Sequence, residues 1–483
     1  MTTRPVWQGK FQPDFNVLPP APQAFRRKSP QDPKAETPSS EEYEDMEMTA
    51  LLTDLSPETI RKAVREQSGF AQGFFEALAA GSTDPAGGIT RDTYGPGENF
   101  GHSVMSDATR ESGFDLSEDA ARNTYARWTP APGAKTVIMG SHLDSVPRGG
   151  NFDGAAGALA GLVAMRTLKS LGVTPRVNLC AMGIRAEESV WFATSYIGSR
   201  AALGTLPLDT LDQASRVDTG RSLAAHMADC GCDLDHLRSG AVDLDPAGLA
   251  ACIELHIEQA PALFESGKPV GICTGIPGNF RYPEARILGR HGHVGTPRRF
   301  RHDAAMAGAA IASGMDRLWA EMNAQGVQLA VTFGRFHTDA AHHGLTTVPG
   351  LFHFSLDVRA YDEATLEKVE AAFDALVKQV EADFHVTVEL GTRKSAPVGH
   401  VDAQIRQGLI GSARDYAIDF MDLGSPASHD AAAFAAAGVP MAMIFVRNEH
   451  GSHNPDEWME LDDFIEGCTV LTGYLYAQYC AGR

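Results

Sequence analysis

The pattern of hydrophobic positions along the chain predicts a sheet covered by helices. Four short apolar runs of the kind found in buried strands are each followed by a turn and then by polar residues; they span 135–140, 176–184, 251–257 and 439–446. Between the first two runs, segment 155–172 has apolar residues at helical spacing and ends at a glycine, which favours a helix with a C-terminal cap. Alternating strands and helices predict an α/β fold, a mostly parallel sheet covered by helices.

A different order of elements fills the middle of the chain. Segments 327–333 and 351–360 are typical of strands, 361–384 is expected to be a long helix, and 385–390 resembles a further strand. The helix has an apolar stripe at a spacing of three and four residues, formed by Leu366, Val369, Phe373, Leu376, Val377 and Val380. We therefore expect an inserted α+β domain that interrupts the first one.

These patterns divide the chain into four parts. Residues 1–51 are rich in Pro, Gln and Glu and predict an arm without its own core. The catalytic domain is expected in two parts, 52–261 and 397–483, on either side of an insert at 262–396 that would serve as a lid and in dimerisation.

Composition and charge narrow the possible partners. The 483 residues are 43% hydrophobic, as in ordinary globular proteins, and carry a formal net charge of −20. Such an acidic chain lacks the basic surface that nucleic acids or anionic membranes require. We find no apolar run approaching the ~20 residues of a membrane helix and no secretory signal. Seven dispersed cysteines suit reduced thiols and predict a cytoplasmic protein.

The candidate chemistry lies where the predicted strands end. Parallel strands bring their carboxyl ends to one edge of a sheet, where sites of α/β proteins form. The polar residues at these positions are His142, Asp144, Asp153, Glu187, Glu188, His256 and His453. Imidazoles and carboxylates are ligands for zinc, manganese and related ions, and a carboxylate can bridge two ions. Taken singly, each is also compatible with an ordinary polar surface residue or a turn, and only their joint placement favours a metal site.

Seven motifs in this order carry a resemblance to a known family: GSHLDSVPRGGNFDGAAG, RAEES, ELHIEQAP, GHVGTP, LDVRA, SHDAAAF and GSHNPDE. The chain resembles the zinc-dependent amidohydrolases of the hydantoinase/carbamoylase type over roughly residues 70 to 480. This family comprises N-carbamoyl-L-amino-acid hydrolases, β-ureidopropionases, allantoate amidohydrolases and ureidoglycolate amidohydrolases. The resemblance implies a catalytic domain like that of the di-zinc peptidases.

The resemblance also implies roles for the metal-site residues. Two divalent ions per subunit, zinc or else manganese or cobalt, would be held by His142, Asp153, Glu188, His256 and His453. Asp153 would be shared between them. Glu187 would be the general base. Apart from the resemblance, Asp144 lies two residues after His142, where its carboxylate can accept the second ring N–H of His142 and so orient the ring.

Further positions match family residues that bind the substrate. Gln259 and His429 would contact it, and Arg359 would bind its carboxylate. His293 would reach across a homodimer, formed through the inserted domain, and stabilise the oxyanion. Arg359 is likewise expected to act across the dimer, although Asp357-Val358-Arg359 is also compatible with a simple surface ion pair.

Three positions depart from the family pattern. Ser189 replaces a glycine after the two glutamates, the stretch after His293 is one residue shorter with two added arginines, and Thr346 stands where the family has a substrate-binding Asn. A Thr side chain cannot form the same hydrogen bonds as an amide. All three changes lie at positions that would surround the substrate, so the sequence does not identify the substrate.

Three hypotheses follow from the sequence. The first is hydrolysis of a linear C–N amide bond in an N-carbamoyl amino acid or similar ureido compound, which releases carbon dioxide, ammonia and the amine. The second keeps the two metals but takes an N-acyl amino acid or other small amide. The third is a metal-binding scaffold without turnover, which the presence of Glu187 disfavours.

Overall fold

The computed structural model describes residues 55–480 of the chain. The arm predicted for residues 1–51 lies outside the described residues. No helix in the described part is long and apolar enough to cross a membrane.

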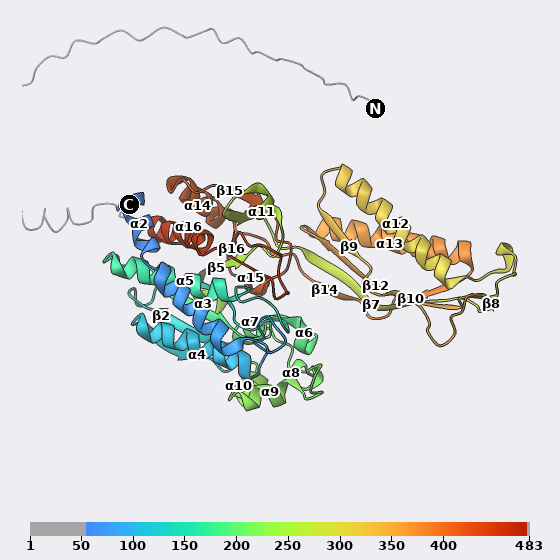
Figure 1. The fold of residues 1–483 in the computed structure, drawn as a ribbon, viewed down its shortest axis with the longest axis horizontal. Coiled ribbons are helices and arrows are strands. Elements are labelled where there is room, and N and C mark those ends of the chain that lie inside the picture. Colours follow the sequence, from blue (N-terminus) through green and yellow to red (C-terminus); the bar gives the residue numbers. More distant parts are fainter. Residues whose placement is uncertain (1–54, 481–483) are drawn as a thin grey trace, which may run out of the picture. The chain divides into compact units, whose positions relative to one another are not determined.

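The larger sheet has eight strands in the order β1-β2-β4-β3-β5-β16-β6-β15 (Figure 1). Its strands are β1 (Asp115–Glu118), β2 (Thr124–Trp128), β3 (Thr136–His142), β4 (Asn178–Ile184), β5 (Leu249–Ile257), β6 (Val270–Cys273), β15 (Phe420–Leu423) and β16 (Met441–Val446). The four central strands β4, β3, β5 and β16 run parallel, whereas β2 pairs antiparallel to β4 and β6 antiparallel to β16. The predicted mostly parallel sheet is confirmed.

Both faces of this sheet are covered, which explains its continuous apolar strands. Along β3, Val137 and Met139 pack into one hydrophobic cluster and Ile138 into another on the opposite face. The first face packs against α2 (Pro57–Arg65), α3 (Ser68–Ser82), α4 (Pro96–Glu111), α5 (Ala155–Ser170), α14 (Ala403–Asp415) and α16 (Leu461–Tyr479). The second face packs against α7 (Ile197–Ala202), α11 (Ala262–Ser266) and α15 (Asp430–Ala436).

Helix α5 is buried on all sides, because it lies between the sheet and the helices α2 and α16. The sequence predicted only one apolar face for it. Its small residues allow the close approach: a Cβ atom on Gly157 would come within 2.2 Å of the carbonyl oxygen of Leu255. The predicted cap is present, with Gly172 at φ +69°.

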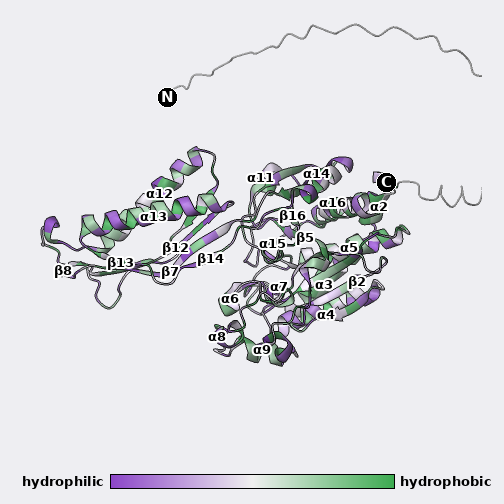
Figure 2. Ribbon diagram, turned by 180° about the vertical axis from the view of Figure 1, so that it is seen from behind, coloured by the Kyte–Doolittle hydropathy of each residue, from purple (hydrophilic) through white to green (hydrophobic). Residues whose placement is uncertain are grey.

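A smaller, antiparallel sheet forms the inserted domain. Its strands are β7 (Gly278–Leu288), β9 (Leu329–Thr332), β10 (Phe336–Thr338), β12 (Leu351–Ala360), β13 (Thr387–Glu389) and β14 (Lys394–Ala396). The helices α12 (Ala304–Ala324) and α13 (Glu363–Phe384) cover one face of it. Figure 2 shows hydrophobic and hydrophilic residues alternating along α13, as expected for its predicted stripe, of which Val369, Phe373, Val377 and Val380 are buried.

The start of the insert differs from the prediction. We expected residue 262, but α11 packs on the first domain and β6 pairs with β16 and β15 in the larger sheet. The inserted sheet therefore begins with β7 and ends with β14 at Ala396. A four-residue buried strand has no periodicity that assigns it to one sheet or the other, which accounts for the difference.

Shorter elements complete the fold. Those of the first domain are α6 (Ser189–Phe192), α8 (Thr210–Gln213), α9 (Leu223–Asp229), α10 (Leu234–Arg238) and the 3-10 turn η1 (Pro246–Gly248). The inserted domain also carries the strand pair β8 (Gly292–His293) and β11 (Thr347–Val348) and the 3-10 turn η2 (Arg298–Phe300). Figure 1 shows β8 at the end of the inserted domain away from β14.

Candidate metal centre and active site

The predicted metal-site residues meet at one edge of the larger sheet. His142 ends β3, Glu187 and Glu188 follow β4, and His256 lies near the end of β5. His453 comes from the loop after β16. Because these four strands are parallel and adjacent, their carboxyl ends converge, as expected for an α/β site.

Three donor atoms form a first cluster. The Nε2 atom of His142 lies 3.5 Å from Asp153 Oδ1, and His256 Nε2 lies 3.2 Å from the same oxygen. The two imidazole nitrogens are 3.5 Å apart. Zinc–ligand bonds of about 2.0–2.1 Å in a tetrahedron place neighbouring donors about 3.3 Å apart, so this triangle has the size that one such ion requires.

The other oxygen of Asp153 belongs to a second cluster. Asp153 Oδ2 lies 3.3 Å from His453 Nε2, which is itself 3.4 Å from Glu188 Oε1. Asp153 therefore presents one oxygen to each cluster, which is the arrangement of a bridging ligand.

Asp153 Oδ1 gives a direct test of whether a cation fits. This atom is buried and forms no hydrogen bond among the described residues, and the imidazole nitrogens of His142 and His256 lie near it. A buried carboxylate oxygen without a donor is costly unless a cation approaches it. The donor set and this unpaired oxygen fit a divalent ion.

Backbone geometry brings His142 and Asp153 together. Asp153 precedes Gly154, which has φ +68° and is the N-cap residue of helix α5. A Cβ atom on Gly154 would lie 2.5 Å from Nδ1 of His142, so only glycine fits between these two ligands.

A third group of possible ligands, Glu254, His256 and His429, is part of the scaffold in this structure. Both oxygens of Glu254 already accept hydrogen bonds, one from Ser141 Oγ at 2.6 Å and one from the backbone N–H of Ala431 at 2.7 Å. Glu254 thereby joins the ends of β3 and β5 to the start of α15.

The segment Arg185 to Glu188, which carries both glutamates, is held through its backbone. Four successive N–H groups donate to side chains: Arg185 to Asn123 Oδ1, Ala186 to Glu98 Oε1, Glu187 to Asp144 Oδ1 and Glu188 to Asp144 Oδ2. The carbonyls of the first three residues accept N–H groups from residues 196–198. Ala186 has φ +58°, a strained conformation for a residue with a side chain, and these bonds hold it there.

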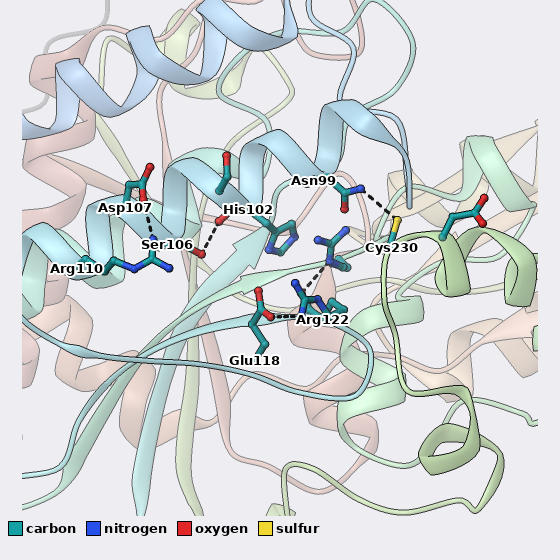
Figure 3. Close-up of a pocket in the computed structure, with 11 residues that line it drawn as sticks. Asn99, His102, Ser106, Asp107, Arg110, Glu118, Arg122 and Cys230 are labelled. Carbon is teal, nitrogen blue, oxygen red and sulfur yellow. Dashed lines mark hydrogen bonds and ion pairs between the residues drawn. The ribbon is translucent and has the colours of Figure 1, made fainter.

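Glu98 is buried beneath this segment and forms an ion pair with Arg185 Nη1 at 2.9 Å. Arg185 also lines a separate groove, and Figure 3 shows other residues of its lining, among them His102, Arg110, Glu118 and Arg122. Its volume is about 350 Å³. Arg110 pairs with Asp107 and Arg122 with Glu118, so the charges of the groove are largely neutralised within it.

Asp144 was predicted to orient His142. His142 Nδ1 lies 3.0 Å from the backbone carbonyl oxygen of Asp144 and 3.4 Å from its carboxylate. The carboxylate also accepts the Thr93 hydroxyl and the two glutamate N–H groups. Asp144 therefore braces the glutamate segment as well as His142, a role that sequence did not suggest.

The two glutamates differ from ordinary surface carboxylates. Burial raises the pKa of Glu187 well above its usual range; His142 opposes this, and Glu188 adds to it. Burial also raises the pKa of Glu188 to about 7, helped by the negative charge of Asp153.

A pocket of about 370 Å³ opens over the candidate metal centre. The predicted residues that line it are His142, Glu187, Glu188, His256, Gln259, Arg359, His429 and His453. Gln259 donates from Nε2 to Asp153 Oδ2 at 2.9 Å. The ring of His429 lies 4.4 Å from that of His256, and burial, together with His256, lowers the pKa of His429 well below its usual range.

Two residues that were predicted to contact the substrate or its oxyanion do not reach this pocket. His293 and Thr347 face each other in the β8–β11 pair, and Thr346 accepts the N–H of Val294 through its carbonyl. His293 and Thr346 therefore lie together on the inserted domain and are absent from the pocket lining.

The structure places Arg359 in an ion pair and in the lining of the pocket. It forms the local ion pair with Asp357, with 3.0 Å between Nε and Oδ1. It also lines the pocket of its own chain, whereas we expected it to act in the site of a partner.

Some residues at the centre were not predicted. Glu457 Oε1 accepts the N–H groups of Phe152 and Asp153 at 3.0 and 3.1 Å, and buried Arg91 donates from Nη2 to the carbonyl of Asp153 at 3.4 Å. Glu457 lies within the GSHNPDE motif, which could have indicated it. Arg91 and Glu98 lie in segments where no such motif was recognised.

Comparison with known proteins identifies the family. Residues 138–477 match the model of peptidase family M20/M25/M40. The chain is 34% identical over 392 residues to an N-carbamoyl-L-amino acid amidohydrolase of Geobacillus stearothermophilus, which covers 80% of this chain and 92% of that protein. The chain belongs to the M20 peptidase family, in its hydantoinase/carbamoylase amidase subgroup.

Other members of this M20 subgroup are also similar to the chain over most of its length. Allantoate amidohydrolase of Escherichia coli is 28% identical over 403 residues, covering 83% of this chain and 95% of that protein. The crystal structure of a hydantoinase/carbamoylase family amidase from Burkholderia ambifaria has a TM-score of 0.73 at 29% identity and covers 86% of this chain and 98% of that one. The chain is thus homologous to metal-dependent amidohydrolases, and its His, Asp and Glu clusters are able to bind divalent metals.

Proposed function

We propose that this M20 member hydrolyses the linear C–N bond of an N-carbamoyl amino acid or a similar ureido compound, yielding carbon dioxide, ammonia and the free amine. The observation that carries the proposal is Asp153, which presents one oxygen to each of two donor clusters beside the half-buried Glu187. The sequence similarity to an N-carbamoyl-L-amino acid amidohydrolase supports the proposal that a carbamoyl C–N bond is cleaved.

In this proposal His142, Asp153 and His256 hold one divalent ion, and Asp153, Glu188 and His453 hold the other. Zinc, manganese and cobalt all suit this donor set. When bound, the ions supply Lewis acidity and lower the pKa of water.

The chain's own residues supply the remaining steps. Glu187 accepts a proton from the attacking water and returns it to the leaving nitrogen. Arg359 binds the substrate carboxylate with its planar guanidinium group, and Gln259 and His429 contact the part of the substrate near the reacting carbon.

We further propose a homodimer formed through the inserted domain. His293 and Thr346 would reach the pocket of the partner, where His293 stabilises the oxyanion. Large apolar side chains are exposed on the same part of the inserted domain, among them Val294, Phe300 and Leu345, and such exposure favours an interface. The seven free cysteines suit a cytoplasmic location.

A second candidate is hydrolysis of an N-acyl amino acid at the same centre. Thr346 supports this second candidate, since its single hydroxyl replaces the amide that the family uses to hold substrate. A non-catalytic scaffold is disfavoured, because Glu187 lines the pocket without a structural partner for its carboxylate among the described residues.

The deciding experiment measures ammonia release by metal-loaded protein. The panel contains N-carbamoyl-L- and D-amino acids, N-carbamoyl-β-alanine, allantoate and ureidoglycolate. N-acetyl amino acids are assayed beside them for free amine. Turnover of a ureido compound supports the proposal, and turnover of acyl compounds alone would assign the chain to the second candidate.

A further inference from the structure

The wall of the active-site pocket is polar. Four hydroxyl-bearing serines line it, together with Tyr196, whereas the only apolar lining residues are Pro426 and Ala427. The serines are Ser189, Ser195, Ser428 and Ser452. A bulky aliphatic or aromatic substrate side chain would find little apolar surface to replace its contact with water.

Two arginines of the inserted sheet line the same pocket. Arg281 on β7 stands directly opposite Asp357 on β12, and Arg359 follows two positions later on the same face of β12. Asp357 lies between the two guanidinium groups, with Oδ2 2.6 Å from Arg281 Nε and Oδ1 3.0 Å from Arg359 Nε.

This arrangement leaves positive charge and donors for a ligand. Two guanidinium groups share a single carboxylate. Among the described residues, neither Nη group of Arg281 has a hydrogen-bond partner, and Arg359 Nη1 has none either. Arg359 alone can bind one carboxylate bidentately, so Arg281 is available for a second acceptor group.

We propose that Arg281 is a specificity-determining residue, and that the substrate is a small ureido acid with a second polar acceptor group, such as a further carboxylate or amide. This inference rests on the proposed function, because it concerns the same pocket and the same bond. Arg359 then binds the carboxylate next to the ureido nitrogen, and Arg281 binds the acceptor on the side chain.

A matched set of substrates tests the preference. N-carbamoyl derivatives of L-aspartate, L-asparagine and L-leucine are nearly equal in size but differ in polarity. We expect kcat/KM for the aspartate or asparagine derivative to exceed that for the leucine derivative by about 10-fold or more. A preference for the leucine derivative would overturn the proposal.

Substitution of Arg281 tests the residue itself. Arg281→Met should lower kcat/KM for the preferred polar derivative by about 10-fold or more, but change that for N-carbamoylglycine less than about 3-fold. Arg286→Met is the control, because Arg286 lies on the same strand and pairs with Glu389 away from the pocket. An equal loss on the glycine derivative would mean that Arg281 only holds Arg359 through Asp357, and would overturn the assignment.

A binding measurement tests this inference independently of the proposed function. Calorimetric titration of the metal-loaded Glu187→Gln variant measures affinity without turnover. Tighter binding of the aspartate or asparagine derivative, lost in the Arg281→Met, Glu187→Gln double variant, supports the inference even if the wild-type protein cleaves a different bond. Equal binding of the polar and leucine derivatives would overturn it.

Discussion

At the scale of single residues, the site depends on Asp153 and Glu187, which have different surroundings. Asp153 faces imidazoles on both oxygens, whereas Glu187 is half-buried and is influenced by the negative charges of Glu188 and Asp430. The first arrangement suits a ligand that stays ionised, and the second suits a group that exchanges protons.

Glu187→Gln tests the proton transfer. We expect kcat to fall by about 100-fold or more, since a general base contributes 10²–10⁴-fold. Bound metal, measured by elemental analysis, should stay at the wild-type level. Full activity in this variant would refute the role of Glu187.

Substitution of Asp153 tests the bridge. Asp153→Ala should lose metal from both clusters, whereas His453→Ala should lose it from one only, because Asp153 contributes to both. Metal counts by mass spectrometry distinguish the two variants. Equal metal loss in both would argue against a shared carboxylate.

At the scale of elements, the loop after β4 is positioned by residues far away in sequence. Glu98 lies in the first turn of α4, and Asn123 immediately precedes β2. Asn123 accepts the backbone N–H of Arg185, and Glu98 accepts that of Ala186. The positions of the Glu187 and Glu188 carboxylates therefore depend on how α4 and the β1–β2 turn pack against this loop.

Glu98→Ala should impair the reaction without touching substrate. It leaves Arg185 buried without its partner, at a cost of about 3–5 kcal/mol in folding stability. Thermal unfolding should show this loss, and kcat should fall more than KM changes, because Glu187 is displaced. Glu98→Gln, which still accepts the Ala186 N–H, should recover part of kcat; no difference between the two variants would refute the positioning role.

The sequence predicted that the candidate ligands lie together, because parallel strands place their ends at one edge and because His142, Asp153 and Glu188 lie in recognisable motifs. Glu98 and Arg91 were missed since their contacts with the site cross more than fifty residues, and no local pattern marks such pairs. The assignment of β6 was missed for a similar reason: its four apolar residues fit either sheet, and only pairing with β16 decides.

At the scale of the whole molecule, metal binding and folding should be linked. The two clusters draw ligands from β3, β5 and the loops after β4 and β16, so a bound ion connects parts of the chain far apart in sequence. Ligands that bind only the folded state raise its stability.

Chelation should therefore lower Tm as well as abolish activity. Without cations, several acidic groups lie close together at the centre, and only imidazoles and the buried guanidinium group of Arg91 offset their charge. Differential scanning fluorimetry with a chelator, followed by zinc, manganese or cobalt, measures both the loss and the recovery. An unchanged Tm after complete metal removal would contradict the link.

Assembly can be tested on the exposed face of the inserted domain. We expect the protein to be a dimer in solution, and Leu345→Asp with Phe300→Asp to produce monomers with much reduced activity, since His293 would no longer reach a partner. Light scattering measures the mass. A fully active monomer would contradict the proposed dimer.

The backbone bonding of Arg185 to Glu188 has a consequence for motion. This segment is neither helix nor strand, yet all four of its amide hydrogens are donated to side chains. Loops of irregular shape usually exchange these hydrogens with solvent quickly, but here exchange requires breaking bonds to Asn123, Glu98 and Asp144. The segment that carries Glu187 and Glu188 should therefore exchange as slowly as the central strands, and should stay rigid while the rest of the pocket adjusts to a ligand.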